Sequence, residues 1–373
     1  MTKHPRFGLI FDALLPLIAT LAALAIGAVM LALLGANPAK AYGAMIQGAF
    51  GSTNAVADTL VKSTPLLLVG LGICIAFRGG VINIGGEGQL VVGAVSATLV
   101  GLTLPEGPAW LIIPAALLTG FLAGGIWGGI PGLLKAYFNV NEILSTIMMN
   151  QIAVQGMNFL LRDIMIDPVQ LQAASRIPQT ARLALAFDLP RLVPTRLHLG
   201  TGLAILVAIL VYIFLWRTSV GYRIRAVGLN PHASRYAGIR VPRYIVLSLL
   251  LSGAFAGLAG AIQVYGVHHR MFTDGSATGF TGSAGFNGIV AALFGQLHPL
   301  GTIPASFLFG ALLVGANAMQ RAVQVPSALI TALNGLVVIF VVSSEIWRRR
   351  RSRQRMKEGG EEVRSPAEAE VAA

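Results

Sequence analysis

The feature that most constrains the fold is a series of apolar segments, each long enough to cross a membrane. A hydrocarbon layer of about 30 Å requires a helix of roughly 20 apolar residues. The first such segment, residues 13–35, has Thr20 as its only polar side chain. Because the chain is 55% hydrophobic and only 11% charged, with a mean hydropathy of +0.73, we predict an all-α polytopic membrane protein.

Charged breaks between the apolar segments predict the number and orientation of the spans. Basic residues favour the cytoplasmic side, so "KHPR" near the start and "RRRRSRQRMK" at 348–357 place both termini in the cytoplasm. The same rule places loop 217–243, with six arginines and no acid, inside, and leaves loop 162–196 outside. We predict about ten transmembrane helices, which begin near residues 10, 62, 88, 110, 142, 199, 244, 282, 301 and 327.

The domain organisation follows from these spans. Residues 1–346 form one transmembrane domain, and residues 347–373 form a basic then acidic cytoplasmic tail whose composition predicts disorder. A division after the fifth span gives two halves of opposite orientation, an inverted 5+5 repeat of a kind common in transporters. Its support is that "GGEGQLVVGA" (85–94) and "GFNGIVAALFG" (285–295) are both glycine-rich entries to an apolar span.

Several kinds of chemistry are excluded by the motifs. The stretch "RGGVINIGGEGQL" (78–90) has glycines at phosphate-loop spacing, but Gly86 and Glu87 stand where such a loop needs lysine and a hydroxyl residue. The six histidines form no HExxH motif, and no G-x-S-x-G elbow occurs. We therefore expect no catalytic residue, metal or bound cofactor. The net charge of +12 gathers at membrane edges, so we also expect no nucleic acid partner.

Amide side chains dominate the polar positions within the spans. Together they suit a path for a neutral, hydrogen-bonding solute, whereas any single one is expected to join helices to one another. Glu87 and Glu142 are the acids nearest to the spans. A carboxylate at mid-membrane is functional by default, whereas the alternative places both at the cytoplasmic ends of spans. The predicted path residues are Asn83, Glu87, Gln89, Asn141, Asn150 and Asn287.

The arginine-rich loop contains a short predicted helix. Asn230 suits an N-cap, Pro231 the first helical position, and Gly238 a left-handed C-terminal residue. A helix of about two turns is too short to be stable alone, so we expect it to dock through its alanine face on a partner. The alternative is a helix that lies on the lipid surface. The predicted docking residues are Gly228, Asn230, Pro231, Ala233, Arg235, Tyr236, Ala237 and Gly238.

Longer segments resemble a known family. "RAVGLNPHASRYAGI" (225–239) followed by "LSGAFAGLAGA" (251–261) resembles the signature of permease subunits of bacterial ABC importers of the ribose and branched-chain amino acid type. Ser234 stands where that family usually has alanine. "AFRGGVINIGGEGQL", "NEILSTIMMNQIA" and "GFNGIVAALFGQLHPLG" are most similar to its nucleoside (guanosine/uridine) branch. The similarity covers roughly residues 55 to 345, and within it the glycines of 83–89 are expected to permit tight helix packing.

The resemblance implies a transport function and partners. It implies a multi-pass permease in the bacterial inner membrane, which presents its short helix to a tandem ATPase that uses the ATP. It also implies a second homologous permease, an extracytoplasmic solute-binding protein or lipoprotein, and alternating access powered by the ATPase. A sugar permease of the same family is the nearest alternative. An ATP-independent transporter, which would need a buried ion-coupling carboxylate, and a structural scaffold are the alternatives from other classes.

Overall fold

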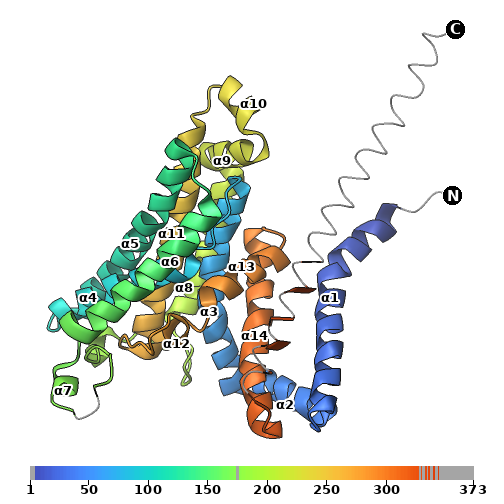
Figure 1. The fold of residues 1–373 in the computed structure, drawn as a ribbon, viewed down its shortest axis with the longest axis vertical. Coiled ribbons are helices and arrows are strands. Elements are labelled where there is room, and N and C mark those ends of the chain that lie inside the picture. The colour runs from blue at the N-terminus through green and yellow to red at the C-terminus, as the bar shows by residue number, and fades with distance from the viewer. Residues whose placement is uncertain are drawn as a thin grey trace. The chain divides into compact units, whose positions relative to one another are not determined.

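The computed structural model describes residues 5–173 and 176–326, together with positions 329, 332–333, 335–336, 339–340 and 343. Over these residues the regular structure is helical (Figure 1), apart from the two isolated bridges Gln179 to Phe272 and Arg191 to His198. The predicted tail 347–373 and much of the predicted span near residue 327 lie outside the described residues. The predicted all-α fold is confirmed for the part that is described.

The helices follow the apolar segments of the sequence. In chain order they are α1 (Pro5–Leu33), α2 (Pro38–Phe50), α3 (Thr53–Arg78), α4 (Gly86–Thr103), α5 (Ala109–Phe138), α6 (Glu142–Phe159), α7 (Pro168–Leu171), α8 (Leu199–Arg217), α9 (Ser219–Leu229), α10 (Pro231–Tyr236), α11 (Val241–Gln263), α12 (Thr278–Thr281), α13 (Ala284–Phe294) and α14 (Pro299–Val323). The π-helical turns η1 (Leu160–Ile164) and η3 (Val264–His268) extend α6 and α11, and η2 (Leu185–Phe187) is a 3₁₀ turn.

Five of the described helices are long and apolar enough to cross a membrane: α3, α5, α8, α14, and α11 together with η3. They support a polytopic membrane protein, but the predicted ten full spans are not confirmed. The segment predicted to span from near residue 282 forms α13, which has only 11 residues and a length of about 16 Å. This length is too short to cross the membrane. The helix does not continue from α12, because the left-handed residues Gly282 and Ser283 separate the two.

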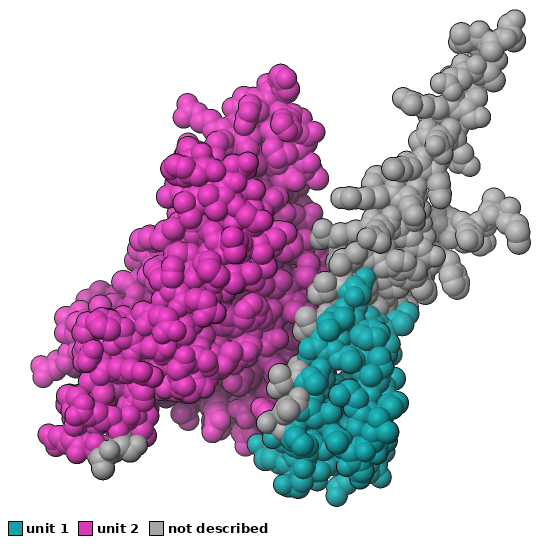
Figure 2. All heavy atoms as spheres, in the orientation of Figure 1, with its two compact units in different colours: residues 1–43, 319–373 teal, residues 44–318 magenta. Residues whose placement is uncertain are grey.

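The chain divides into two compact units, which Figure 2 colours separately. Residues 1–43 and 319–373 form the first unit, where the Tyr42 hydroxyl donates a hydrogen bond to the carbonyl oxygen of Leu24 and so joins α2 to α1. Residues 44–318 form the second unit, which contains every candidate functional residue predicted from the sequence. In this unit α9 and α10 lie at one end of the helix bundle and α7 lies at the other (Figure 1).

Glycines bring three helices of the second unit into backbone contact. α11 packs against α4 and α5. A Cβ atom added at Gly124 of α5 would lie 2.5 Å from the carbonyl oxygen of Gly253 and 2.6 Å from Cα of Gly257, both on α11. One added at Gly93 of α4 would lie 2.3 Å from Cα of Gly257. Membrane helices gain van der Waals contact when small residues allow such close approach, so these glycines hold the bundle together.

Candidate functional site

The first candidate site is the protrusion formed by α9 and α10. The Asn230 side chain accepts a hydrogen bond from the backbone N–H of Ala233 at 3.0 Å, Pro231 occupies the first turn of α10, and Gly238 has a φ of +78°. These three local predictions are confirmed. One detail is corrected: α10 ends at Tyr236, so Ala237 is its C-cap rather than part of a helical face.

The protrusion exposes apolar side chains that no described residue covers. Tyr236 is 95% exposed and Leu229 is 87% exposed, while Ala233 and Ala237 are also exposed. Ser234 is buried and points towards the protein, which accounts for a small residue there. Exposed apolar groups gathered on a protrusion are typical of a contact surface. The predicted docking residues therefore lie together, and their contact with a partner stays a prediction.

Gly228 fixes the base of the protrusion to the bundle. A Cβ atom added there would lie 2.1 Å from the carbonyl oxygen of Arg78 and 2.7 Å from the backbone nitrogen of Gly80. The last turn of α9 therefore abuts the end of α3 with no room for a side chain. Sequence reasoning named Gly228, but only the structure shows why the position requires glycine.

A cluster around Trp216 extends this connection to further helices. The guanidinium carbons of Arg78 and Arg225 lie 5.4 and 5.5 Å from the Trp216 ring centroid, which is cation–π distance. The ring of His298 lies 5.0 Å from that of Trp216, and Nε of Arg78 donates to the carbonyl oxygen of Leu297 at 3.2 Å. The ends of α3 and α8 and the middle of α9 thus meet the turn between α13 and α14.

The second candidate site is a buried polar cluster halfway along the bundle. Asn83 Nδ2 donates to Gln89 Oε1 at 2.9 Å and to Ser252 Oγ at 2.8 Å, and its Oδ1 accepts from the backbone N–H of Gly85 at 2.8 Å. Ser252 lies 11 positions after Val241, the first residue of α11, which is roughly 16 Å along the helix. The cluster therefore lies about halfway along a helical segment that is long enough to cross a membrane about 30 Å thick.

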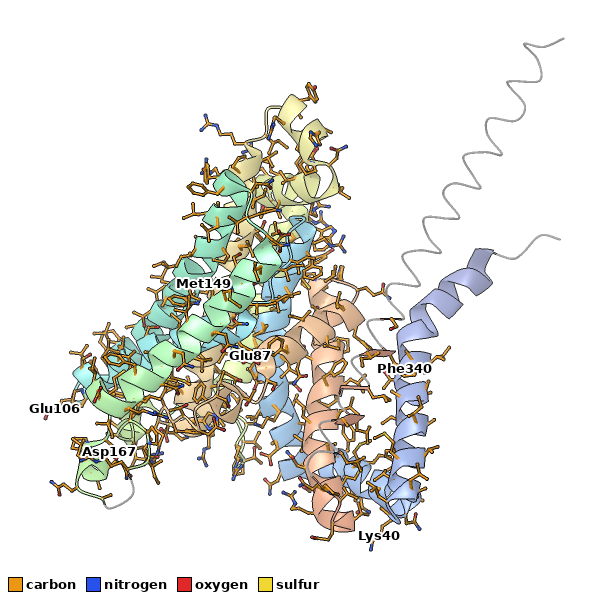
Figure 3. All side chains as sticks on the ribbon, viewed as in Figure 1. Lys40, Glu87, Glu106, Met149, Asp167 and Phe340 are labelled. Atoms are coloured by element: carbon orange, nitrogen blue, oxygen red, sulfur yellow. The ribbon has the colours of Figure 1, made fainter. Side chains whose placement is uncertain are left out.

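Glu87 and Asn150 complete this cluster. Asn150 accepts from the backbone N–H of Gly88 at 2.8 Å and donates to the carbonyl oxygen of Ile84 at 3.0 Å. Glu87 is only 3% exposed and lies midway along the bundle (Figure 3). Its Oε1 accepts from the backbone N–H of Gly285 at 3.2 Å. The carboxylate therefore joins the first turns of α4 and α13, where helix dipoles favour negative charge.

The remaining predicted residues lie elsewhere. Asn141 is exposed and caps α6, where it accepts from the backbone N–H groups of Ile143 and Leu144. Glu142 forms an ion pair with Lys135 at 3.0 Å, so this acid belongs to the junction of α5 and α6. Asn287 is partly exposed on α13. Four of the six predicted path residues thus share one cluster, whereas contact with a solute stays a prediction for all six.

The opposite end of the bundle carries a charged group that the sequence did not predict. Asp188 lies 3.1 Å from the Arg182 guanidinium and 2.7 Å from Nδ1 of His269. Nearby His198 is 1% exposed, and burial lowers its pKa to about 4. The part of the chain that the structure describes holds no group of three or more side chains suited to a metal ion.

The family can now be assigned by comparison. Residues 55–342, which include the protrusion and the buried cluster, match the family described as "Branched-chain amino acid transport system / permease component". The chain belongs to this family. The predicted membership is confirmed, and the permease is not an enzyme, because the family is a transport component.

Three relatives extend the comparison over most of the permease. A guanosine ABC transporter permease of Bacillus subtilis is 40% identical over 331 residues, 89% of this chain and 93% of the relative. A glucose ABC transporter permease of Haloferax volcanii is 33% identical, over 90% and 88% of the two chains. A nucleoside ABC transporter permease of Lactococcus lactis is 31% identical, over 88% and 90%. No solved structure matches the permease.

Proposed function

We propose that the chain is the transmembrane subunit of an ABC importer that carries nucleosides across a bacterial inner membrane. Two of the three relatives described above are named for guanosine or nucleoside transport, and the more similar is 40% identical. The single structural observation that carries the proposal is the exposed protrusion of α9 and α10, which is anchored to the bundle and which no residue that the structure describes covers.

The protrusion is the proposed contact with a separate tandem ATPase, which uses the ATP. Leu229, Tyr236 and the two exposed alanines present an apolar surface framed by arginines. The close contact of Gly228 with the end of α3, and the Trp216 cluster, transmit movement of the ATPase to four parts of the bundle. The expected result is alternating access, in which this permease and a second homologous permease rock around a shared path.

The buried cluster supports the path for the solute. Its amide groups satisfy one another by hydrogen bonds, so they fix the glycine-rich entry of α4. Asn287 and Phe286 on the exposed side of α13 lie next to Gly285, the contact of Glu87. These neutral groups suit a nucleoside, which has many hydrogen-bonding atoms and an aromatic base. They offer no guanidinium to pair with the phosphate of a nucleotide.

A sugar permease is the second candidate, because the relative from Haloferax volcanii is named for glucose. An ATP-independent transporter is disfavoured by the family assignment. Whether the solute is a nucleoside or a sugar, an extracytoplasmic binding protein delivers it to the permease. The binding site of that protein then also contributes to substrate selection.

Competition for uptake separates the two candidates. Cells that express the complete transporter and lack other nucleoside uptake would receive labelled guanosine, with excess unlabelled uridine, ribose or glucose. We expect uptake that requires an active ATPase, competition by uridine and no competition by either sugar. Competition by glucose with none by uridine would favour the sugar function instead.

A further inference from the structure

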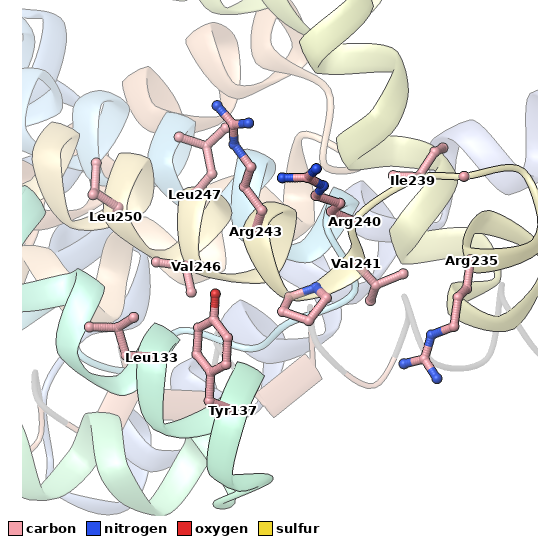
Figure 4. Close-up of a pocket in the computed structure, with 12 residues that line it drawn as sticks. Leu133, Tyr137, Arg235, Ile239, Arg240, Val241, Arg243, Val246, Leu247 and Leu250 are labelled. Carbon is pink, nitrogen blue, oxygen red and sulfur yellow. The ribbon is translucent and has the colours of Figure 1, made fainter.

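A groove at the arginine-rich end of the bundle lies beside the first candidate site, with which it shares Arg235 and Gly238. It has a volume of about 760 Å³, within the range of small-molecule sites. Figure 4 shows that its wall comes from the end of α5, the segment after α10 and the start of α11. The groove therefore lies beside the protrusion, where α11 enters the membrane.

The rim of the groove is positively charged. Arg235, Arg240 and Arg243 contribute to the lining and are exposed. None of the three forms an ion pair with a carboxylate in the described part of the chain, where the ion pairs involve Lys135, Arg182 and His269 instead. Figure 4 shows the guanidinium groups of Arg240 and Arg243 on the same side, whereas that of Arg235 points the other way. The pair favours an anionic occupant, and a planar guanidinium matches phosphate oxygens well.

The floor of the groove is apolar. Val246 and Leu250 lie one turn apart on α11, and Leu133 faces them from α5. Leu250 is seven positions beyond Arg243, so the floor extends roughly 10 Å along the helix from the charged rim. That depth lies within the hydrocarbon region if the arginines mark the membrane edge.

We propose that this groove binds an anionic phospholipid, with its phosphate beside Arg240 and Arg243 and an acyl chain along Leu133, Val246 and Leu250. Only an amphiphile matches both halves of the groove. An extended acidic protein segment could satisfy the arginines, but its backbone polar groups would be left unpaired along the apolar floor. The proposal goes beyond the transport function, because it depends on neither the substrate nor the ATPase.

Direct lipid binding tests the proposal. The full-length permease, purified in mild detergent, would be titrated with phosphatidylglycerol or with phosphatidylcholine of the same acyl chains, and bound lipid counted by native mass spectrometry. The variants are Arg240→Gln with Arg243→Gln, which weakens the rim, and Val246→Trp, which fills the floor. Arg217→Gln is the matched control, because Arg217 is an exposed arginine at the same end of the bundle but does not line the groove.

We expect phosphatidylglycerol to bind and phosphatidylcholine to bind much more weakly. Each arginine near an anionic surface contributes about fivefold, so the double variant should bind about 25-fold more weakly. Val246→Trp should also lose binding, while Arg217→Gln should retain it. Equal binding of the two lipids, or parental binding by the double variant, would overturn the proposal. So would a double variant that keeps the lipid and loses only a co-purifying ATPase, because the groove would then be a protein contact.

Discussion

Replacement of Gly124 by alanine tests the close packing of α5 on α11. The added Cβ would lie 2.5 Å from the carbonyl oxygen of Gly253 and 2.6 Å from Cα of Gly257, whereas ordinary contact begins at 3.4 Å. The two helices must therefore separate by about 1 Å, and overpacking of this kind costs about 1–3 kcal/mol. Alanine also favours a helix over glycine by about 1 kcal/mol, so the net loss is smaller.

A second glycine in α5 isolates the packing cost. At Gly129 the nearest atom to an added Cβ is Cδ1 of Leu250 at 3.8 Å, so Gly129→Ala adds the same methyl group without a clash. The gain in helix propensity is common to both variants. The free energy of unfolding of Gly124→Ala should therefore be about 1–3 kcal/mol lower than that of Gly129→Ala. Thermal unfolding of the purified permease in detergent measures it. Equal midpoints for the two variants would refute the proposed backbone contact.

Three further outcomes are expected from single substitutions. Glu87→Gln keeps an oxygen that accepts from the N–H of Gly285, so this variant should retain much of the uptake. Glu87→Leu removes that oxygen and should lose uptake. Complete loss of uptake with glutamine would indicate that the charge is essential. Asn230→Ala removes the cap of α10 at a cost of about 1 kcal/mol, so hydrogen exchange over 231–236 should accelerate, and unchanged exchange would contradict the capping role. The pKa of His198 is lowered by burial to about 4, so the unfolded chain binds more protons below pH 6.5 and stability should fall as the pH drops towards 4. His198→Leu should reduce that dependence, and an identical pH profile would show that His198 does not cause it.

The structure of the protrusion could be predicted because its rules are local. An N-cap, a proline in the first turn and a left-handed glycine act within a few residues, and all three are present from Asn230 to Gly238. The polytopic helical class could also be predicted from the sequence, because composition and the length of apolar segments determine it.

The interior of the bundle could not be predicted in the same way. Ser252 pairs with Asn83 across 169 positions of sequence, and no local pattern selects this partner among many polar residues. The half-length of α13 was missed, because its limits depend on left-handed residues on both sides, Gly282 and Ser283 before it and Gln296 and Leu297 after it. The backbone contacts of Gly257 likewise depend on which helices become neighbours.

The most direct test of the proposed coupling is the substitution Ala237→Arg. Ala237 is exposed at the end of α10, so a long charged side chain there leaves the bundle intact but obstructs a close contact with the ATPase. Ser219→Arg is the control, because it adds the same charge at an exposed position in the first turn of α9.

The measurement is ATP-dependent guanosine uptake by the complete transporter, with permease abundance and co-purifying ATPase determined on the same samples. We expect Ala237→Arg to show normal abundance, weakened ATPase association and no uptake, while Ser219→Arg behaves as the parent. A helix that merely lies on the lipid surface would tolerate the arginine, since anionic headgroups attract it by about 1 kcal/mol. Parental uptake by Ala237→Arg would therefore contradict the assignment of α10 as the contact through which the ATPase drives transport.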